Sequence, residues 1–178
     1  MRRGFTIVEL LIVIVVIAIL AAITVVAYTG IQNRARATGF TDAIRKVEKA
    51  FQLKAVADQR NVYWNESELG GVNPLISTII TNTNLKDYLP AIPEVSGMSG
   101  IRWNYDNDGD TYVNNCSTGA TGLNIIIYDI NQYADVLLDV DKTLDDGNLS
   151  CGNFRHVPAD AGGDGAVFYH FGNANSSL

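Results

Sequence analysis

The sequence predicts an α+β protein in which one long N-terminal helix packs on an antiparallel β-sheet. Three observations favour this fold: a long apolar run at the N-terminus, an apolar face with helical spacing after it, and short β-type runs in the C-terminal half. The length of 178 residues suits a single core, because domains usually have about 100–150 residues.

The first expected element is a helix over residues 5–30. From Phe5 to Tyr28 the only charged side chain is Glu9. A helix of this length is about 36 Å long, and a bilayer core is about 30 Å thick. Because lipid offers no hydrogen bonds, a single spanning segment must be helical. The run is also longer than the apolar part of a secretory signal peptide, so we expect a transmembrane helix.

Glu9 is the unusual residue of this run. A charge costs about 2.5–3.5 kcal/mol at the centre of a membrane helix and less near its end. Such a residue is by default a candidate functional residue. The alternative is an acid near the interface whose carboxylate reaches the lipid headgroups.

A second helical segment is expected over residues 31–58. Phe40, Ile44, Val47 and Phe51 recur at spacings i, i+4, i+7 and i+11, which places them on one helix face. We expect this amphipathic half to continue the first helix and to pack on a globular α+β head of residues 59–178.

The strands of the head are predicted from apolar and β-branched runs. Residues 61–100 contain Gly and Pro and read as irregular, with one short helix. The expected strands are Ile101–Tyr105 and Thr111–Cys116, which would form a hairpin, Gly122–Ile130, and Ala166–Phe171. Ala134–Val140 fits either a helix or a strand.

The formal net charge of −6 is unevenly distributed. Residues 1–60 carry nine basic and four acidic side chains, whereas the rest carries four basic and fifteen acidic ones. An acidic head repels phosphates, so we expect no direct binding of nucleic acid. The acidity favours either solubility of an exported domain or attraction between basic stems and acidic heads in a filament.

Residues Arg3 to Leu11 resemble the class III leader junction of type IV pilins and pseudopilins, because a glycine, a phenylalanine and a glutamate stand in register before the apolar run. The resemblance implies a leader of residues 1–4, cleavage between Gly4 and Phe5 by a prepilin peptidase, and methylation of the new N-terminus at Phe5. Glu9 would be the fifth residue of the mature chain. In a filament, Glu9 would meet the α-amino group of Phe5 on a neighbouring subunit.

The resemblance also implies the pilin fold and a structural role. The chain would be a subunit of a surface filament for adhesion, motility or uptake, anchored in the cytoplasmic membrane with its head outside before assembly. Its partners would be copies of itself, the prepilin peptidase, the assembly platform and the membrane. Many pilins have a proline where this chain has Val26, so no local break of the helix is expected there.

Two other functions stay open. A secretion-type pseudopilin has the same leader, and a membrane-anchored binding module would form no filament. We find no nucleophile elbow, phosphate loop or zinc signature in the sequence, so no enzyme is expected.

Two sites are predicted in the head. Asn104, Asp106, Asp108 and Asp110, with Gly109, resemble the first half of a calcium loop, but Asn115 stands where the closing glutamate belongs. Ordinary turn chemistry explains the same residues. A second acidic run contains Asp139, Asp141, Asp145 and Asp146. No cofactor is required, and calcium is the only ion that the pattern suggests.

Cys116 and Cys151 are the only two cysteines. In an exported protein such a pair favours a disulfide, which would close a loop of about 36 residues. Two buried free thiols are the alternative.

Overall fold

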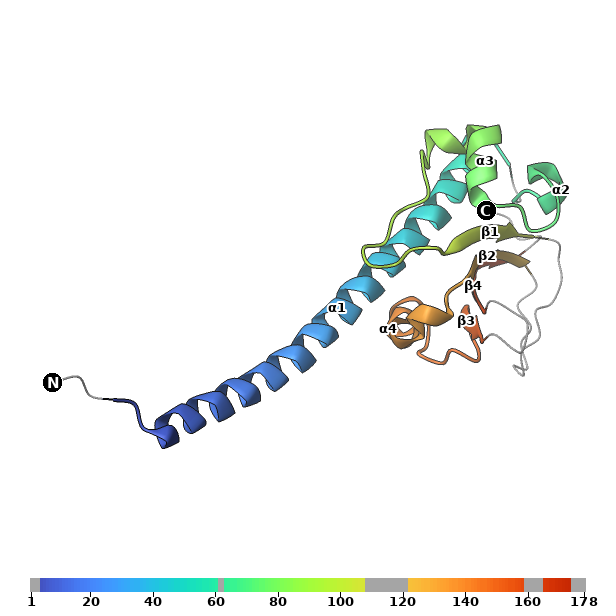
Figure 1. Ribbon diagram of the computed structural model, residues 1–178. Helices are drawn as coiled ribbons and strands as arrows, with labels where there is room; N and C mark the ends of the chain where they lie inside the picture. The colour runs from blue at the N-terminus through green and yellow to red at the C-terminus, as the bar shows by residue number, and fades with distance from the viewer. Residues whose placement is uncertain (1–3, 61–62, 108–121, 159–164, 174–178) are drawn as a thin grey trace. The chain divides into compact units, whose positions relative to one another are not determined.

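A computed structural model describes residues 4–60, 63–107, 122–158 and 165–173. Within these residues a long helix comes first and short helices follow it, and the remaining elements are four strands, a short 3-10 helix and one further α-helix (Figure 1). The helical elements are α1 (Ile7–Ala57), α2 (Glu66–Leu69), α3 (Ile76–Asn82), η1 (Asn84–Asp87), η2 (Asn131–Tyr133) and α4 (Ala134–Leu144). The strands are β1 (Arg102–Asp106), β2 (Gly122–Tyr128), β3 (Phe154–Val157) and β4 (Ala166–Asn173).

The chain divides into two compact units, Met1–Ala35 and Arg36–Leu178. Helix α1 has 51 residues, so the two helical segments predicted from the sequence belong to one helix. The helix passes through Val26, where no proline interrupts it, and through Gly30.

The second half of α1 supplies one wall of the core of the second unit. Phe40, Ile44, Val47 and Phe51 are fully buried, which confirms the predicted apolar face. The ring centroids of Phe40 and Trp103 lie 5.8 Å apart in an edge-to-face arrangement. Those of Phe51 and Tyr105 lie 4.8 Å apart, and the two rings are stacked. Both partners lie on β1, so the helix packs directly on the sheet.

The sheet has the strand order β1-β2-β4-β3, and all three pairings are antiparallel. Tyr105, Ile125, Tyr169 and Phe154 stand opposite one another across the four strands. All four are buried in the same cluster as the α1 residues, so this face of the sheet carries the main core. The α+β fold and the pilin-like arrangement of helix on sheet are therefore confirmed.

Several expected elements differ from those in the structure. The expected strand at Thr111–Cys116 lies outside the described residues, and β1 pairs with β2 in the described part of the chain. The ambiguous segment Ala134–Val140 is helical, because Val136, Leu137 and Val140 all point into the core with helical spacing. Strand β3 and the one-turn helix α2 were not predicted.

Candidate functional sites

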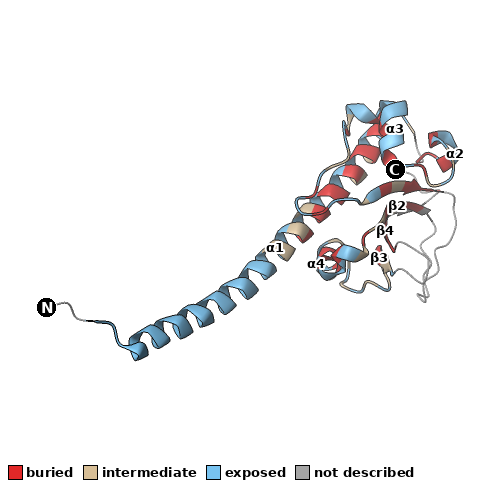
Figure 2. Cartoon of the chain, in the orientation of Figure 1, coloured by how far each residue is buried: buried red, intermediate tan, exposed pale blue. Residues whose placement is uncertain are grey.

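The N-terminal half of α1 presents an uninterrupted apolar surface. Every large apolar side chain from Phe5 to Ile31 is exposed, with exposed fractions between 46% and 85%, and Figure 2 shows no buried residue along this part of the helix. In the described part of the chain, α1 is the one helix that is long and apolar enough to cross a membrane. A surface of this kind must be covered by lipid or by other protein.

Glu9 closes a capping box at the start of α1. The backbone N–H and the hydroxyl of Thr6 both donate to Glu9 Oε2 at 2.8 Å, and the N–H of Glu9 donates back to Thr6 Oγ1 at 3.2 Å. These bonds satisfy donors that the first turn of a helix leaves free. We did not predict Thr6 as a partner of Glu9, although the spacing Thr-x-x-Glu is a known start signal for helices.

Two threonines farther along this surface form hydrogen bonds within the helix. The hydroxyls of Thr24 and Thr29 donate to the carbonyls of Ala21 and Val26, each at 2.9 Å. Such bonds allow hydroxyl groups to lie in lipid without losing their hydrogen bonds. Glu9 is thus the only charge that this surface carries.

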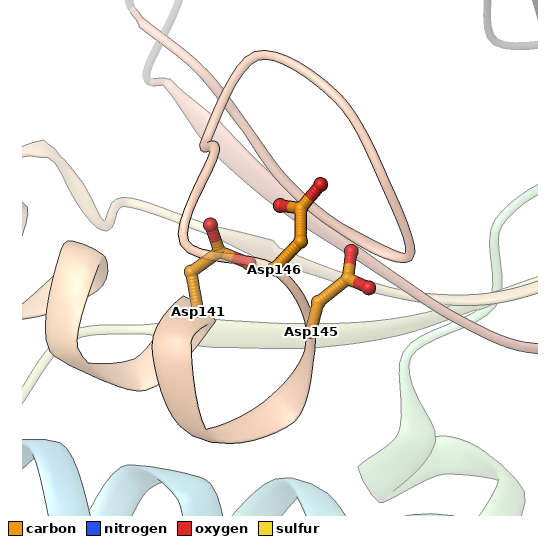
Figure 3. Close-up of side chains that lie close together, drawn as sticks. All are labelled: Asp141, Asp145 and Asp146. Carbon is orange, nitrogen blue, oxygen red and sulfur yellow. The ribbon is translucent and has the colours of Figure 1, made fainter.

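A group of three carboxylates lies where α4 ends in the head. One oxygen each of Asp141, Asp145 and Asp146 lies within 4.8 Å of the others, and Figure 3 shows the three side chains gathered beside the loop that follows the helix. Asp141 is completely buried, Asp145 is half-buried and Asp146 is exposed. Burial, together with the charges of Asp145 and Asp146, raises the pKa of Asp141 to about 6.

Asp145 connects the end of α4 to the start of β3. Its Oδ2 atom accepts hydrogen bonds from the backbone N–H groups of Asn153 and Phe154, the latter at 3.3 Å. Gly152 has φ +94°, and a Cβ atom there would overlap the Asp145 carboxylate. The close approach of the loop to Asp145 therefore requires glycine at this position.

The predicted calcium loop is only partly described. Asn104 and Asp106 lie on β1, where Asn104 Nδ2 donates to the Asn73 carbonyl at 2.5 Å and Asp106 Oδ2 accepts from Asn124 Nδ2 at 3.0 Å. Asp108, Asp110 and the closing position Asn115 lie outside the described residues. This site stays a prediction.

The predicted disulfide is also only partly described. Cys151 is half-buried, and the described part of the chain contains no free cysteine. Cys116 lies outside the described residues, so the pairing of these two residues stays a prediction.

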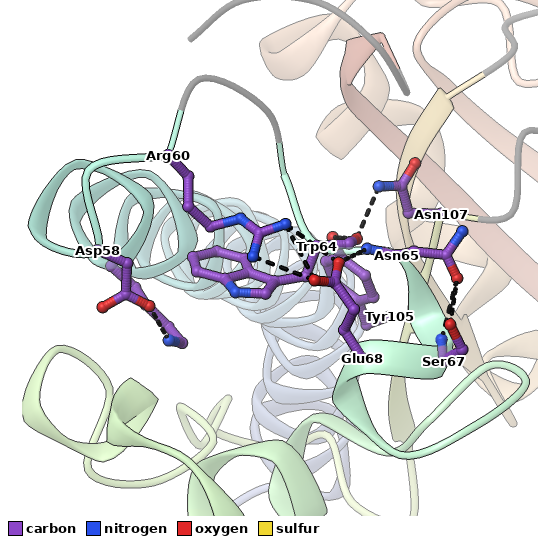
Figure 4. Close-up of polar contacts among 9 residues, drawn as sticks. Asp58, Arg60, Trp64, Asn65, Ser67, Glu68, Tyr105 and Asn107 are labelled. Carbon is purple, nitrogen blue, oxygen red and sulfur yellow. Dashed lines mark hydrogen bonds and ion pairs between the residues drawn. The ribbon is translucent and has the colours of Figure 1, made fainter.

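A polar group around Trp64 fixes the segment between α1 and the sheet. The Trp64 carbonyl accepts hydrogen bonds from Tyr105 Oη at 2.6 Å and Asn107 Nδ2 at 2.7 Å. The guanidinium of Arg60 lies over the Trp64 ring and pairs with Glu68 at 3.1 Å (Figure 4). Because each contact is made between residues of the head itself, we assign this group a structural role.

Comparison with known proteins identifies the N-terminal segment. A family model described as the prokaryotic N-terminal methylation motif matches residues 1–25. No curated protein and no solved structure matches the chain. The matched motif is the class III prepilin-type leader of type IV pilins and pseudopilins.

The motif and the fold point to the same class of protein. The motif of residues 1–25 supports a type IV pilin- or pseudopilin-like prepilin, and the long helix packed on an antiparallel sheet is a pilin-like architecture. Proteins with this motif are structural subunits rather than enzymes. The motif implies processing by a prepilin peptidase, assembly by pilus-type machinery and anchoring in a membrane before assembly.

Proposed function

We propose that this protein is a structural subunit of a type IV pilus-like surface filament that serves adhesion, motility or uptake. The observation that carries the proposal is the prepilin motif of residues 1–25, which includes the start of α1. The large apolar side chains of this part of the helix are all exposed. In the membrane, lipid covers this surface. In a filament, the same surface of neighbouring subunits covers it, through close packing of apolar helices.

Processing would generate the group that Glu9 recognises. Cleavage after Gly4 frees the α-amino group of Phe5, and the peptidase then methylates it. The two capping bonds of Glu9 both end on Oε2, and Oε1 accepts no hydrogen bond within the described residues. Oε1 is therefore available for the ammonium group of Phe5 on a neighbouring subunit. An ion pair between two subunits would relieve the cost of burying either charge alone and would select one axial register.

The first experiment shears appendages from the native cells and determines the mass of the N-terminal peptide in the sheared fraction. We expect a peptide that begins at methylated Phe5 and is abundant in sheared filaments. The same processed peptide confined to membranes would instead indicate a pseudopilin or a minor subunit. A peptide that still begins at Met1 would contradict the processing and favour an anchored binding module.

Two variants separate the charge of Glu9 from its capping role. Glu9→Gln removes the charge but keeps a residue that can close a capping box. We expect this variant to be cleaved normally and to be absent from sheared filaments. Thr6→Val removes the capping hydroxyl but keeps the charge, and we expect it to assemble. Normal filaments from Glu9→Gln would refute the ion pair, and loss of filaments from Thr6→Val alone would assign the role to the cap.

A further inference from the structure

We propose that Asp141, Asp145 and Asp146 form a binding site for a divalent cation, and that this cation is calcium. The site belongs to the head and does not depend on whether the protein forms filaments. The first observation is that Asp141 is completely buried and that neither of its carboxylate oxygens has a hydrogen-bond partner in the described part of the chain. A buried carboxylate without a donor is costly, so such groups are usually paired or bind a metal ion.

The position of the three carboxylates adds to this cost. They lie at the C-terminal end of α4, where the helix dipole is negative and disfavours anions. The basic residues around them come from three elements. Lys142 of α4 pairs with Asp139 at 3.3 Å. Arg45 of α1 donates a hydrogen bond to the Thr143 carbonyl at 3.3 Å. Arg155 of β3 is buried near Asp145. Asp141 has no partner among them, and a cation would supply the missing positive charge.

The geometry and the ligand atoms select the kind of cation. Oxygens that share one calcium ion at 2.3–2.6 Å can be at most about 5 Å apart, and the three carboxylates meet this limit with oxygens within 4.8 Å. Magnesium requires shorter bonds and nearly ideal octahedral geometry. Zinc prefers nitrogen and sulfur ligands, and the cluster contains only carboxylates. The exposed side chain of Asp146 leaves an open side through which the ion can enter and keep water ligands.

A bound ion would join two elements that are separate in the sequence. Asp141 belongs to the last turn of α4, and Asp145 accepts hydrogen bonds from the start of β3. An ion between these carboxylates would therefore fix the end of the helix to the edge of the sheet. We expect calcium to stabilise the folded head.

The test uses the full-length protein in detergent micelles after removal of divalent ions by a chelator. We expect added calcium chloride to raise the Tm of the head by roughly 5–10 °C at about 100 times its Kd. Magnesium chloride at the same concentration should have a smaller effect. Isothermal titration should show at least one calcium ion per chain, and one fewer for Asp141→Asn. A Tm that does not respond to calcium at about 10 mM, well above the Kd of about 10⁻⁴–10⁻³ M for extracellular modules, would overturn the proposal.

Three variants decide whether the cluster is the site. Asp141→Asn should abolish the response to calcium, and it should raise the Tm of the ion-free protein because it removes a buried charge. Asp146→Asn changes only an exposed side chain and should weaken calcium binding about tenfold or more without affecting folding. Asp139→Asn is the matched control, because it removes the same charge from the same helix outside the cluster. A wild-type calcium response from Asp146→Asn and from a folded Asp141→Asn would also overturn the proposal.

Discussion

The two carboxylate oxygens of Glu9 have different surroundings, and this difference bears on both of its suggested roles. Oε2 accepts two hydrogen bonds from Thr6, so a negative charge near the end of an apolar helix already has local partners. These bonds reduce the cost of placing the residue in lipid. The capping role and the proposed role in assembly are therefore compatible, because they use different atoms.

His156 provides a pH-dependent contribution to stability at the residue scale. It is half-buried on β3, its Nε2 atom lies 3.1 Å from Asn131 Oδ1, and burial lowers its pKa below the ordinary value of 6.5. The unfolded chain therefore binds a proton more readily than the folded one. The stability from neutral His156 is fully present above pH 6.5 and is lost as the pH falls through the lowered pKa.

We predict that the wild-type protein loses more stability than His156→Gln when the pH is lowered from 7.5 to 5. Denaturant unfolding at a series of pH values measures this difference, and the NMR titration of the ring assigns it to His156. His156→Gln keeps a polar side chain but has no group that titrates in this range. Parallel pH profiles for the two proteins would show that protonation of His156 is not coupled to folding.

The candidate functional residues of the chain were predictable to different degrees. Gly4, Phe5 and Glu9 lie within one motif of six residues, so the sequence alone predicts them as a site. The contact between Thr6 and Glu9 is equally local but was not predicted, because the apolar run by itself already accounts for a helix. The burial of Asp141 was not predictable in this way, since it depends on how the loop before β3 folds over the end of α4.

At the scale of elements, the second half of α1 contributes most clearly to stability. We predict that Phe51→Ala destabilises the head by about 3–5 kcal/mol, because it removes a fully buried ring and leaves a cavity beside Tyr105. Leu53→Ala is the control, since Leu53 lies two residues away and is 45% exposed. We expect Leu53→Ala to lower the free energy of unfolding by less than about 1 kcal/mol. Denaturant unfolding monitored by tryptophan fluorescence gives both values, and equal costs would contradict this account of the core.

The elements that the sequence predicted are those with strong local patterns. The apolar face of α1 repeats over four positions, and β2 contains three consecutive isoleucines. Strand β3 has only four residues, and Arg155 and His156 occupy its centre. Two polar side chains in so short a run give no strand pattern in the sequence. The segment is a strand because it pairs with β4. Its assignment therefore required the tertiary structure.

At the scale of the whole molecule, the two units differ in what they need from their surroundings. Within the described residues, burial begins at Ala37, and no residue of 5–35 is buried. We predict that a fragment of residues 36–178 is soluble and unfolds cooperatively, with a free energy of unfolding within about 1 kcal/mol of that of the head in the intact protein. Circular dichroism and denaturant unfolding measure both properties.

A shorter fragment supplies the control for this prediction. Residues 52–178 lack Phe40, Ile44, Val47 and Phe51, which are all fully buried. Without these four side chains the sheet loses one wall of its core, so this fragment should not fold. A folded fragment 52–178, or an unfolded fragment 36–178, would show that the core is divided differently along the chain.

The strand order has a consequence for the timing of folding. Strand β4 is the last of the four in the sequence, yet it lies between β2 and β3 and hydrogen-bonds to both. As the ribosome releases the chain, β1 and β2 can pair early, but among the described strands β3 has no partner until Ala166–Asn173 emerges. The sheet therefore cannot be completed during most of synthesis and export. A chain that stalls before β4 should expose its unpaired apolar strands to proteases and chaperones.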